Sequence, residues 1–183
     1  MASVSAHFIA SFRNWMTRWL NFTLLGLLLC MHGCSYYSFS GASIPAHLTT
    51  IAIPIAEDQS TSPLTLLDES LTELMIDRFV RQTRLILTED EAEADILLTT
   101  QITRYSNAPT SVTGQERAQY NRIAISVSAQ YANQVDGDVL ERTFSGFDDY
   151  DPLEGGLEAE EAAALAALEN IADDLFTAAT SNW

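Results

Sequence analysis

The sequence predicts an α+β domain in which two helices pack on one face of a four- to five-stranded, mixed but mostly antiparallel sheet. Segments with helical periodicity over residues 65–84 and 157–179 bracket a run of segments that are rich in β-branched residues or alternate between apolar and polar. Such runs of strands flanked by helices are typical of this class. A length of 183 residues allows one such domain and a targeting segment.

The N-terminal segment predicts a secretory signal. Arg13 and Arg18 precede an uncharged apolar run over residues 20–29. A membrane-spanning helix needs about 20 apolar residues, so the run is typical of a signal core rather than of a span. The segment 31–34, Met-His-Gly-Cys, resembles the lipobox of bacterial lipoproteins. We therefore expect residues 1–33 to be a lipoprotein signal peptide.

The lipobox resemblance implies that Cys34 becomes the diacylated N-terminus, and two acyl chains attach a protein stably to a membrane. Residues 34–48 are then expected to form a lipidated tether, followed by a single domain over residues 49–183. Position 35 is where a lipoprotein sorting signal would place Asp. This chain has Ser35 there, and the absence of Asp implies the outer membrane. A plain secretory signal with a chance cysteine and an uncleaved anchor remain alternatives, and a start at Met16 would give a compact signal.

The first half of the domain predicts strand, helix and strand. Isoleucines alternate with smaller residues over 51–55, which favours a strand that Pro54 places at an edge. Apolar residues at helical spacing opposite acidic ones predict a helix over 65–84, and residues 85–87 predict a short strand. A capping-box variant marks the helix start, and three arginines that suit the helix dipole mark its end: Thr65 with Asp68, then Arg78, Arg81 and Arg84.

The second half predicts a meander of strands. Residues 95–105 are rich in β-formers, and residues 106–118 read as a polar loop. Strict alternation over 122–131 is typical of a half-buried antiparallel strand. Asp136-Gly137 favours a type I′ hairpin turn, and the partner strand is expected over 139–147.

The last segment predicts a second helix. Helical periodicity runs from Leu157 to Ala179. Its apolar stripe is expected to face the sheet: Leu165, Leu168, Ile171, Ala172, Leu175 and Phe176.

The charge balance excludes a nucleic-acid partner. The formal net charge is −16, and all nine cationic residues are arginine, whereas nucleic-acid binding needs Lys and Arg to neutralise phosphates. Removal of Arg13 and Arg18 with the signal leaves seven arginines against 25 acidic residues, a charge of −18. The absence of lysine with abundant acids also suggests adaptation to high salt, where screening lengths fall to about 3 Å at 1 M. A GC-rich genome is the alternative explanation.

The residue types argue against enzymatic chemistry. His47 is the single histidine left after the signal, and it is expected at the surface. A histidine-activated nucleophile or a typical zinc site is therefore not available, and the sequence holds no phosphate-binding glycine loop. We expect no cofactor and no metal. The acidic run over 148–151 is expected to be a solvated turn rather than a calcium site, although a hydrolase with two carboxylates remains a rival.

The scarce arginines are candidate contacts for a phosphorylated lipid. Arg104 and Arg122 lie near the ends of two predicted neighbouring strands, and Arg117 lies in the loop between them. A hairpin would bring all three to one end of the sheet, where guanidinium groups could bind phosphate bidentately. Local pairing with acids such as Glu116 is the alternative.

The order of several short segments resembles the LptE family of lipopolysaccharide-assembly lipoproteins. The resemblance covers nearly all of the mature chain and depends on order and spacing rather than on any single motif. Its segments are Cys34, 36–41 (Tyr-Tyr-Ser-Phe-Ser-Gly), Ile44-Pro45, 51–54 (Ile-Ala-Ile-Pro), 76–80 (Ile-Asp-Arg-Phe-Val) and 94–98 (Ala-Asp-Ile-Leu-Leu).

The family resemblance implies a non-enzymatic role. It implies an outer-membrane lipoprotein on the periplasmic side that plugs the LptD β-barrel, assists its assembly and helps deliver lipopolysaccharide to the cell surface. It also implies basic lipid contacts, for which Arg104, Arg117 and Arg122 are the candidates. A charge of −18 would repel an anionic glycolipid unless salt screens it or the acids face away. A lipoprotein with another role in envelope assembly or secretion is the main rival.

Overall fold

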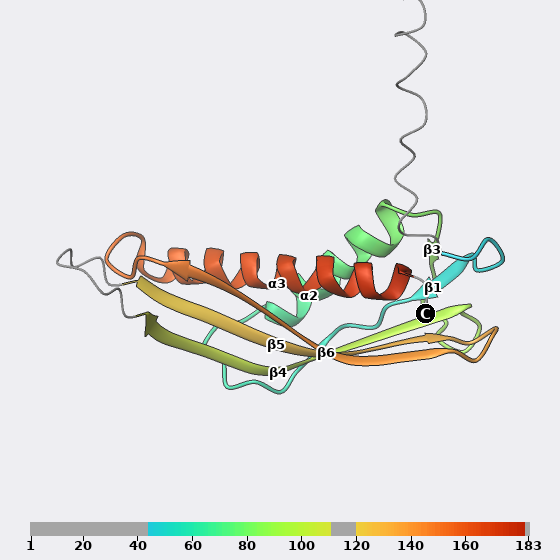
Figure 1. The fold of residues 1–183 in the computed structure, drawn as a ribbon, viewed down its shortest axis with the longest axis horizontal. Helices are drawn as coiled ribbons and strands as arrows, with labels where there is room; N and C mark the ends of the chain where they lie inside the picture. Colours follow the sequence, from blue (N-terminus) through green and yellow to red (C-terminus); the bar gives the residue numbers. More distant parts are fainter. Residues whose placement is uncertain (1–43, 111–119, 182–183) are drawn as a thin grey trace, which may run out of the picture. The chain divides into compact units, whose positions relative to one another are not determined.

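The computed structural model describes residues 44–110 and 120–181, and these residues confirm the α+β class (Figure 1). Two helices and a π-helical turn lie on one face of a six-stranded mixed sheet. The short strand predicted over 85–87 is present, and a further strand of two residues, at Glu57–Asp58, raises the count above the four or five predicted. The elements are β1 Thr50–Ala52, β2 Glu57–Asp58, α2 Leu67–Ile76, the π-helical turn η1 Asp77–Arg81, β3 Ile86–Leu87, β4 Ile96–Thr110, β5 Tyr120–Asn133, β6 Val139–Tyr150 and α3 Gly156–Thr180.

The sheet combines a long antiparallel meander with short parallel additions. Its order is β3-β1-β4-β5-β6, in which β4, β5 and β6 are antiparallel, whereas β1 pairs in parallel with β3 and β4. Strand β2 also pairs in parallel with β4, farther along it than β1. The predicted strand over 51–55 is therefore wrong beyond Ala52. Pro54 has no N–H to donate, so the chain leaves β4 there and returns to it at Glu57.

The core lies between the helices and the meander. The alternation that predicts β5 is confirmed, because every second residue from Ile123 to Tyr131 is buried. Apolar residues of α2, η1 and α3 cover these positions and form one cluster with them. Its fully buried large members include Leu71, Met75, Phe79, Ile96, Leu98, Ile102, Leu168 and Ile171.

The predicted capping box of α2 is wrong. The residue before the helix is Leu66, in the left-handed region at φ 75°, and it makes no side-chain capping bond. Leu64 and Leu67 on either side of it are both buried, and this tight turn allows both side chains to reach the core. The arginines have specific partners beyond the helix dipole: Arg78 pairs with Asp77 and with Asp173 of α3, while Arg84 binds backbone carbonyls.

Two details of the last hairpin and helix also differ from the prediction. A type I′ turn needs a positive φ at both central residues, and in the β5–β6 connection Gly137 alone has one. The connection is a longer turn, in which the Asn133 side chain accepts hydrogen bonds from the N–H groups of Val135 and Asp136. Leu165 is 43% exposed rather than part of the buried stripe. Helix α3 presents small residues to β6 instead: Ala163, Ala164 and Ala167.

Candidate interaction surface

One face of the meander is not covered by helices. Figure 1 shows α2 and α3 on the same side of β4–β6, and directly opposed residues of antiparallel strands share a face. Starting from the outward residues of β5, the register defines five rows, here called the open face. They are Ala108-Arg122-Asp149, Ser106-Ala124-Phe147, Arg104-Ser126-Ser145, Gln101-Ser128-Thr143 and Thr99-Gln130-Glu141.

The open face is electrically neutral and built mostly from small polar residues. Its fifteen positions hold two arginines and two acidic residues, and the others are uncharged. Most acids of the chain lie elsewhere, on the outer surfaces of the helices and in the loop before β4. They include Asp68, Glu69 and Glu73 of α2, Glu158, Glu161, Glu169, Asp173 and Asp174 of α3, and Glu89, Asp90 and Glu93 of the loop. The charges thus balance over these fifteen positions, although the chain as a whole carries a large negative charge.

Arg122 is held on this face by its neighbours. Its guanidinium donates to both carboxylate oxygens of Asp149, at 2.7 and 2.8 Å. The guanidinium carbon lies 4.2 Å from the centroid of the Phe147 ring. The hydrogen bonds from Arg122 lower the pKa of the Asp149 carboxyl. Arg122 is therefore a positioned, locally neutralised cation, as the alternative of local pairing predicts; its described partner is Asp149, and Glu116 lies outside the described residues.

Arg104 has a different environment. It is exposed, and among the described residues it has no hydrogen-bond or ion-pair partner. A register shift between Ile102 and Arg104 marks a β-bulge at Thr103, which brings Arg104 opposite Ser126 and so onto the open face. Four residues of β5 separate its row from that of Arg122, about 13 Å at the usual rise of a strand. The two arginines share a face without converging at one point, and Arg117 lies outside the described residues, as does Cys34.

A shallow depression occupies the opposite end of the open face. Its volume is about 480 Å³, and its lining includes the carboxylates of Glu57, Glu91 and Glu141 beside Gln101 and Gln130. The carboxylate of Glu57 accepts hydrogen bonds from the side-chain amides of Gln101 and of the neighbouring Gln59, at 3.0 and 3.3 Å. This end of the open face is therefore acidic, unlike the end that holds Arg104 and Arg122.

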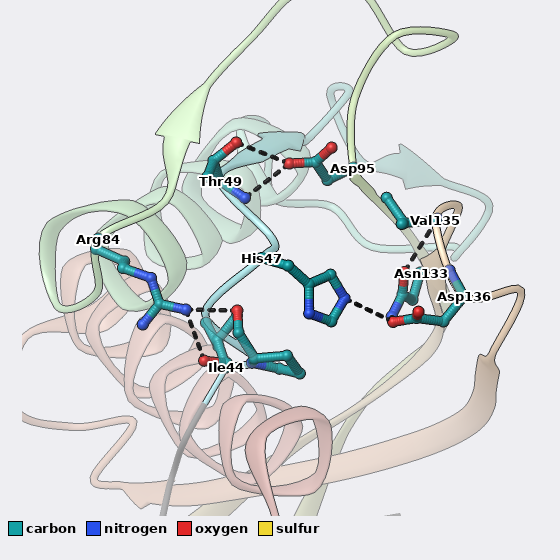
Figure 2. A network of polar contacts seen from close by, with 9 residues as sticks. Ile44, His47, Thr49, Arg84, Asp95, Asn133, Val135 and Asp136 are labelled. Atoms are coloured by element: carbon teal, nitrogen blue, oxygen red, sulfur yellow. Dashed lines mark hydrogen bonds and ion pairs between the residues drawn. The ribbon is translucent and has the colours of Figure 1, made fainter.

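Hydrogen bonds and burial hold residues 44–48, just before β1, against the domain (Figure 2). Arg84 donates to the carbonyls of Ile44 and Pro45, at 2.7 and 2.5 Å. His47 Nε2 lies 2.8 Å from a carboxylate oxygen of Asp136 in the β5–β6 turn. Leu48 is buried in the core. Residues 44–48 thus pack as part of the domain.

Asp95 binds the two residues that follow this segment, Thr49 and Thr50. One of its carboxylate oxygens accepts the backbone N–H and hydroxyl of Thr49, at 2.7 and 2.9 Å, and the N–H of Thr50 at 3.0 Å. These hydrogen bonds lower the pKa of the Asp95 carboxyl to about 2. Sequence reasoning missed Asp95 and Arg84, because their partners lie about 40 residues away.

This lowered pKa predicts a pH dependence of stability. A pKa lower in the folded than in the unfolded chain stabilises the fold above pH 4, and that contribution is lost as the pH falls from about 4 to about 2. Asp95→Asn removes the charge, so its deficit relative to wild type should shrink across that window. Urea unfolding of both proteins between pH 6 and 2 measures the difference, and a constant deficit would contradict the assignment.

A family model described as LptE, lipopolysaccharide-assembly, matches residues 48–179. The chain belongs to the LptE family. No curated protein matches it. The LptE membership identifies a lipopolysaccharide-assembly lipoprotein of the cell envelope.

Solved structures of distant lipoproteins are similar to this LptE-family chain. A minor lipoprotein from Acinetobacter baumannii is 12% identical, with 74% of this chain and 94% of that one covered and a TM-score of 0.47. A hypothetical protein from Chlamydia trachomatis is 11% identical, with coverage of 70% and 91% and a TM-score of 0.46. The PelC dodecamer from Paraburkholderia phytofirmans is 13% identical, with coverage of 71% and 90% and a TM-score of 0.43.

The helices in the described part of this LptE-family chain do not have the character of membrane spans. Over residues 44–110 and 120–181, no helix combines the length and apolar character that crossing a bilayer requires. Helix α3 is the longest of them at 25 residues, and acidic side chains recur along it.

Proposed function

We propose that this chain is the lipoprotein subunit of a lipopolysaccharide-export complex in the outer membrane. Acyl chains on Cys34 anchor it on the periplasmic side, and its domain plugs an LptD-type β-barrel and assists the assembly of that barrel. Lipopolysaccharide passes along the open face, where Arg104, Arg122 and Arg117 are the candidate phosphate contacts. The charge balance of the fifteen register positions of that face, in a chain whose formal net charge is −16, is the observation that supports this arrangement.

Co-purification tests the barrel partnership. The full chain with a C-terminal tag is recovered from detergent-solubilised native outer membranes, and the bound proteins are identified by mass spectrometry. We expect an LptD-type barrel in equal amount. Recovery of the lipoprotein alone, or with a secretion barrel, would contradict the proposal and favour a different envelope-assembly lipoprotein.

Acylation is tested separately by metabolic labelling with radioactive palmitate. We expect label in the wild-type chain and in Cys30→Ser, but not in Cys34→Ser, since Cys34 follows the lipobox. The unlabelled Cys34→Ser protein should also leave the membrane fraction, because loss of both acyl chains removes stable attachment. Label retained in Cys34→Ser, or lost in Cys30→Ser, would place the anchor elsewhere.

The lipid contact is tested by reversing one charge at two sites. Arg104→Glu removes the cation without a partner from the open face, whereas Arg81→Glu makes the same change beside the helices, where Arg81 is exposed and pairs weakly with Asp77 at 3.3 Å. A lost charge-assisted hydrogen bond is worth roughly 1.5–3 kcal/mol. We therefore expect Arg104→Glu to weaken the binding of purified lipopolysaccharide by about tenfold or more, with Arg81→Glu close to wild type.

Equal effects of the two variants would show that overall charge, and not the open face, controls lipid binding. Barrel recovery is measured on the same samples. Retained barrel with reduced lipid binding separates the lipid contact from the plug role.

A further inference from the structure

The two helices diverge at one end and leave a groove that the chain does not fill. It has a volume of about 380 Å³ and lies between the N-terminal parts of α2 and α3. Leu64, Leu67 and Leu168 form its buried base, at 7%, 6% and 0% exposure. Its base is therefore as apolar as the core, whereas its mouth is open.

Two leucines at the mouth of the groove remain exposed. Leu165 of α3 is 43% exposed, although its spacing along the helix predicts burial, and Leu66 before α2 is 59% exposed. Scattered apolar residues are normal on a protein surface. Here, however, two leucines from different elements line the same concavity above a leucine base, which is typical of a site where a partner's side chain packs.

The backbone of Leu66 places its side chain at the mouth of the groove. It is the one residue other than glycine with a positive φ in the described chain, at φ 75° and ψ 13°. The turn lets Leu64 and Leu67 reach the core and leaves the Leu66 side chain exposed, so a partner that covers it would bury a leucine.

The rim of the groove specifies the charge of its occupant. Glu158 and Glu161 lie on α3 beside Leu165, and neither carboxylate has an ion-pair or hydrogen-bond partner among the described residues. Two unpaired carboxylates disfavour an anionic glycolipid, and they attract a segment that carries lysine or arginine. This acidic layer also lies on the side of the sheet opposite the neutral open face, so the two surfaces select different chemistry.

We infer that the α2–α3 groove is a docking site for a protein segment that presents one large aliphatic or aromatic side chain between basic residues. The side chain enters between Leu66 and Leu165, and the basic flanks pair with Glu158 and Glu161. The site lies on the helix layer, so it does not depend on the lipid contact proposed for the open face.

A defined peptide tests this chemistry. The full chain, reconstituted in nanodiscs of neutral lipid, is titrated against a fluorescent twelve-residue peptide with a central leucine flanked by arginines. We expect binding at least tenfold tighter than for peptides with a central serine or with glutamate flanks. The double variant Glu158→Lys, Glu161→Lys should lose the preference for arginine, whereas Glu169→Lys, elsewhere on the exposed surface of α3, should keep it. Equal binding of the three peptides would overturn the inference.

Cross-linking in native cells tests the occupant. A benzophenone amino acid replaces Ala162, an exposed residue of the groove, and a matched control carries it at Glu169. We expect an adduct at position 162 whose partner peptide holds an aliphatic or aromatic residue between basic ones, and at least a fivefold loss of that adduct in the double lysine variant.

Three results would overturn the docking inference. They are an adduct with a second copy or another segment of this chain, an adduct with an acidic or neutral peptide, and a yield at position 162 no higher than at position 169. Co-purification of the barrel does not depend on these results, so failure of the groove and failure of the barrel partnership are distinguishable.

Discussion

Replacing Phe79 by alanine is expected to lower the free energy of unfolding by about 3–5 kcal/mol, a large share of the 5–15 kcal/mol typical of a folded domain. Phe79 lies in the π-helical turn η1 and is fully buried. Its ring packs edge-to-face on Phe176 of α3, at 5.2 Å between centroids, and lies 5.9 Å from the ring of Tyr131 on β5. The Phe79 side chain therefore joins η1 and α3 to the sheet. Its removal leaves a cavity that neither helical segment nor the sheet can close alone.

Phe147→Ala is the matched control for this prediction. Phe147 is 54% exposed on the open face, where it packs under the Arg122 guanidinium. Its loss should cost about 1 kcal/mol or less, because a surface cation–π contact contributes roughly 0.5–1 kcal/mol. Urea unfolding followed by circular dichroism measures both variants. Similar losses for Phe79→Ala and Phe147→Ala would show that the aromatic cluster is not the link between the layers.

The features that follow from local periodicity could be predicted from the sequence. Strand β5 alternates from Ile123 to Tyr131, and the structure buries the apolar set while the residues between them are less buried. Helix α3 has enough periodic residues for its type to be clear, and its bounds differ from the expected ones by one residue at each end. The periodicity predicts these two elements correctly because burial of one face stabilises each of them.

The features that depend on contacts between distant residues could not be predicted. Leu165 has the spacing of a buried residue, but its burial depends on how far α2 extends beside α3, and α2 begins only at Leu67. Strand β2 holds just Glu57 and Asp58, which are poor β-formers, and it exists because the chain returns to the edge of β4. The open face likewise appears only when the register of three strands is known, since no stretch of sequence contains a row.

Gly146→Ala is expected to destabilise the fold by about 3 kcal/mol, because the space for a Cβ atom at this position is already filled. An added methyl group would overlap the backbone carbonyl of Ala167 on α3 and lie 2.9 Å from Cγ1 of Ile171. The φ of Gly146 is not in the left-handed region, so the cost arises from packing alone. The obstacle is backbone rather than a flexible side chain, and relief requires α3 to move away from β6.

Gly137→Ala separates packing from backbone conformation. Gly137 has φ 85° and open space around it, so alanine there should cost about 1 kcal/mol from the left-handed conformation alone. If α3 moves in Gly146→Ala, Glu161 and Leu165 move with it, and the groove should lose its peptide preference while the barrel is still recovered. An equal loss of stability in the two glycine variants, with groove binding intact, would show that β6 yields instead and that close packing at Gly146 does not position the docking site.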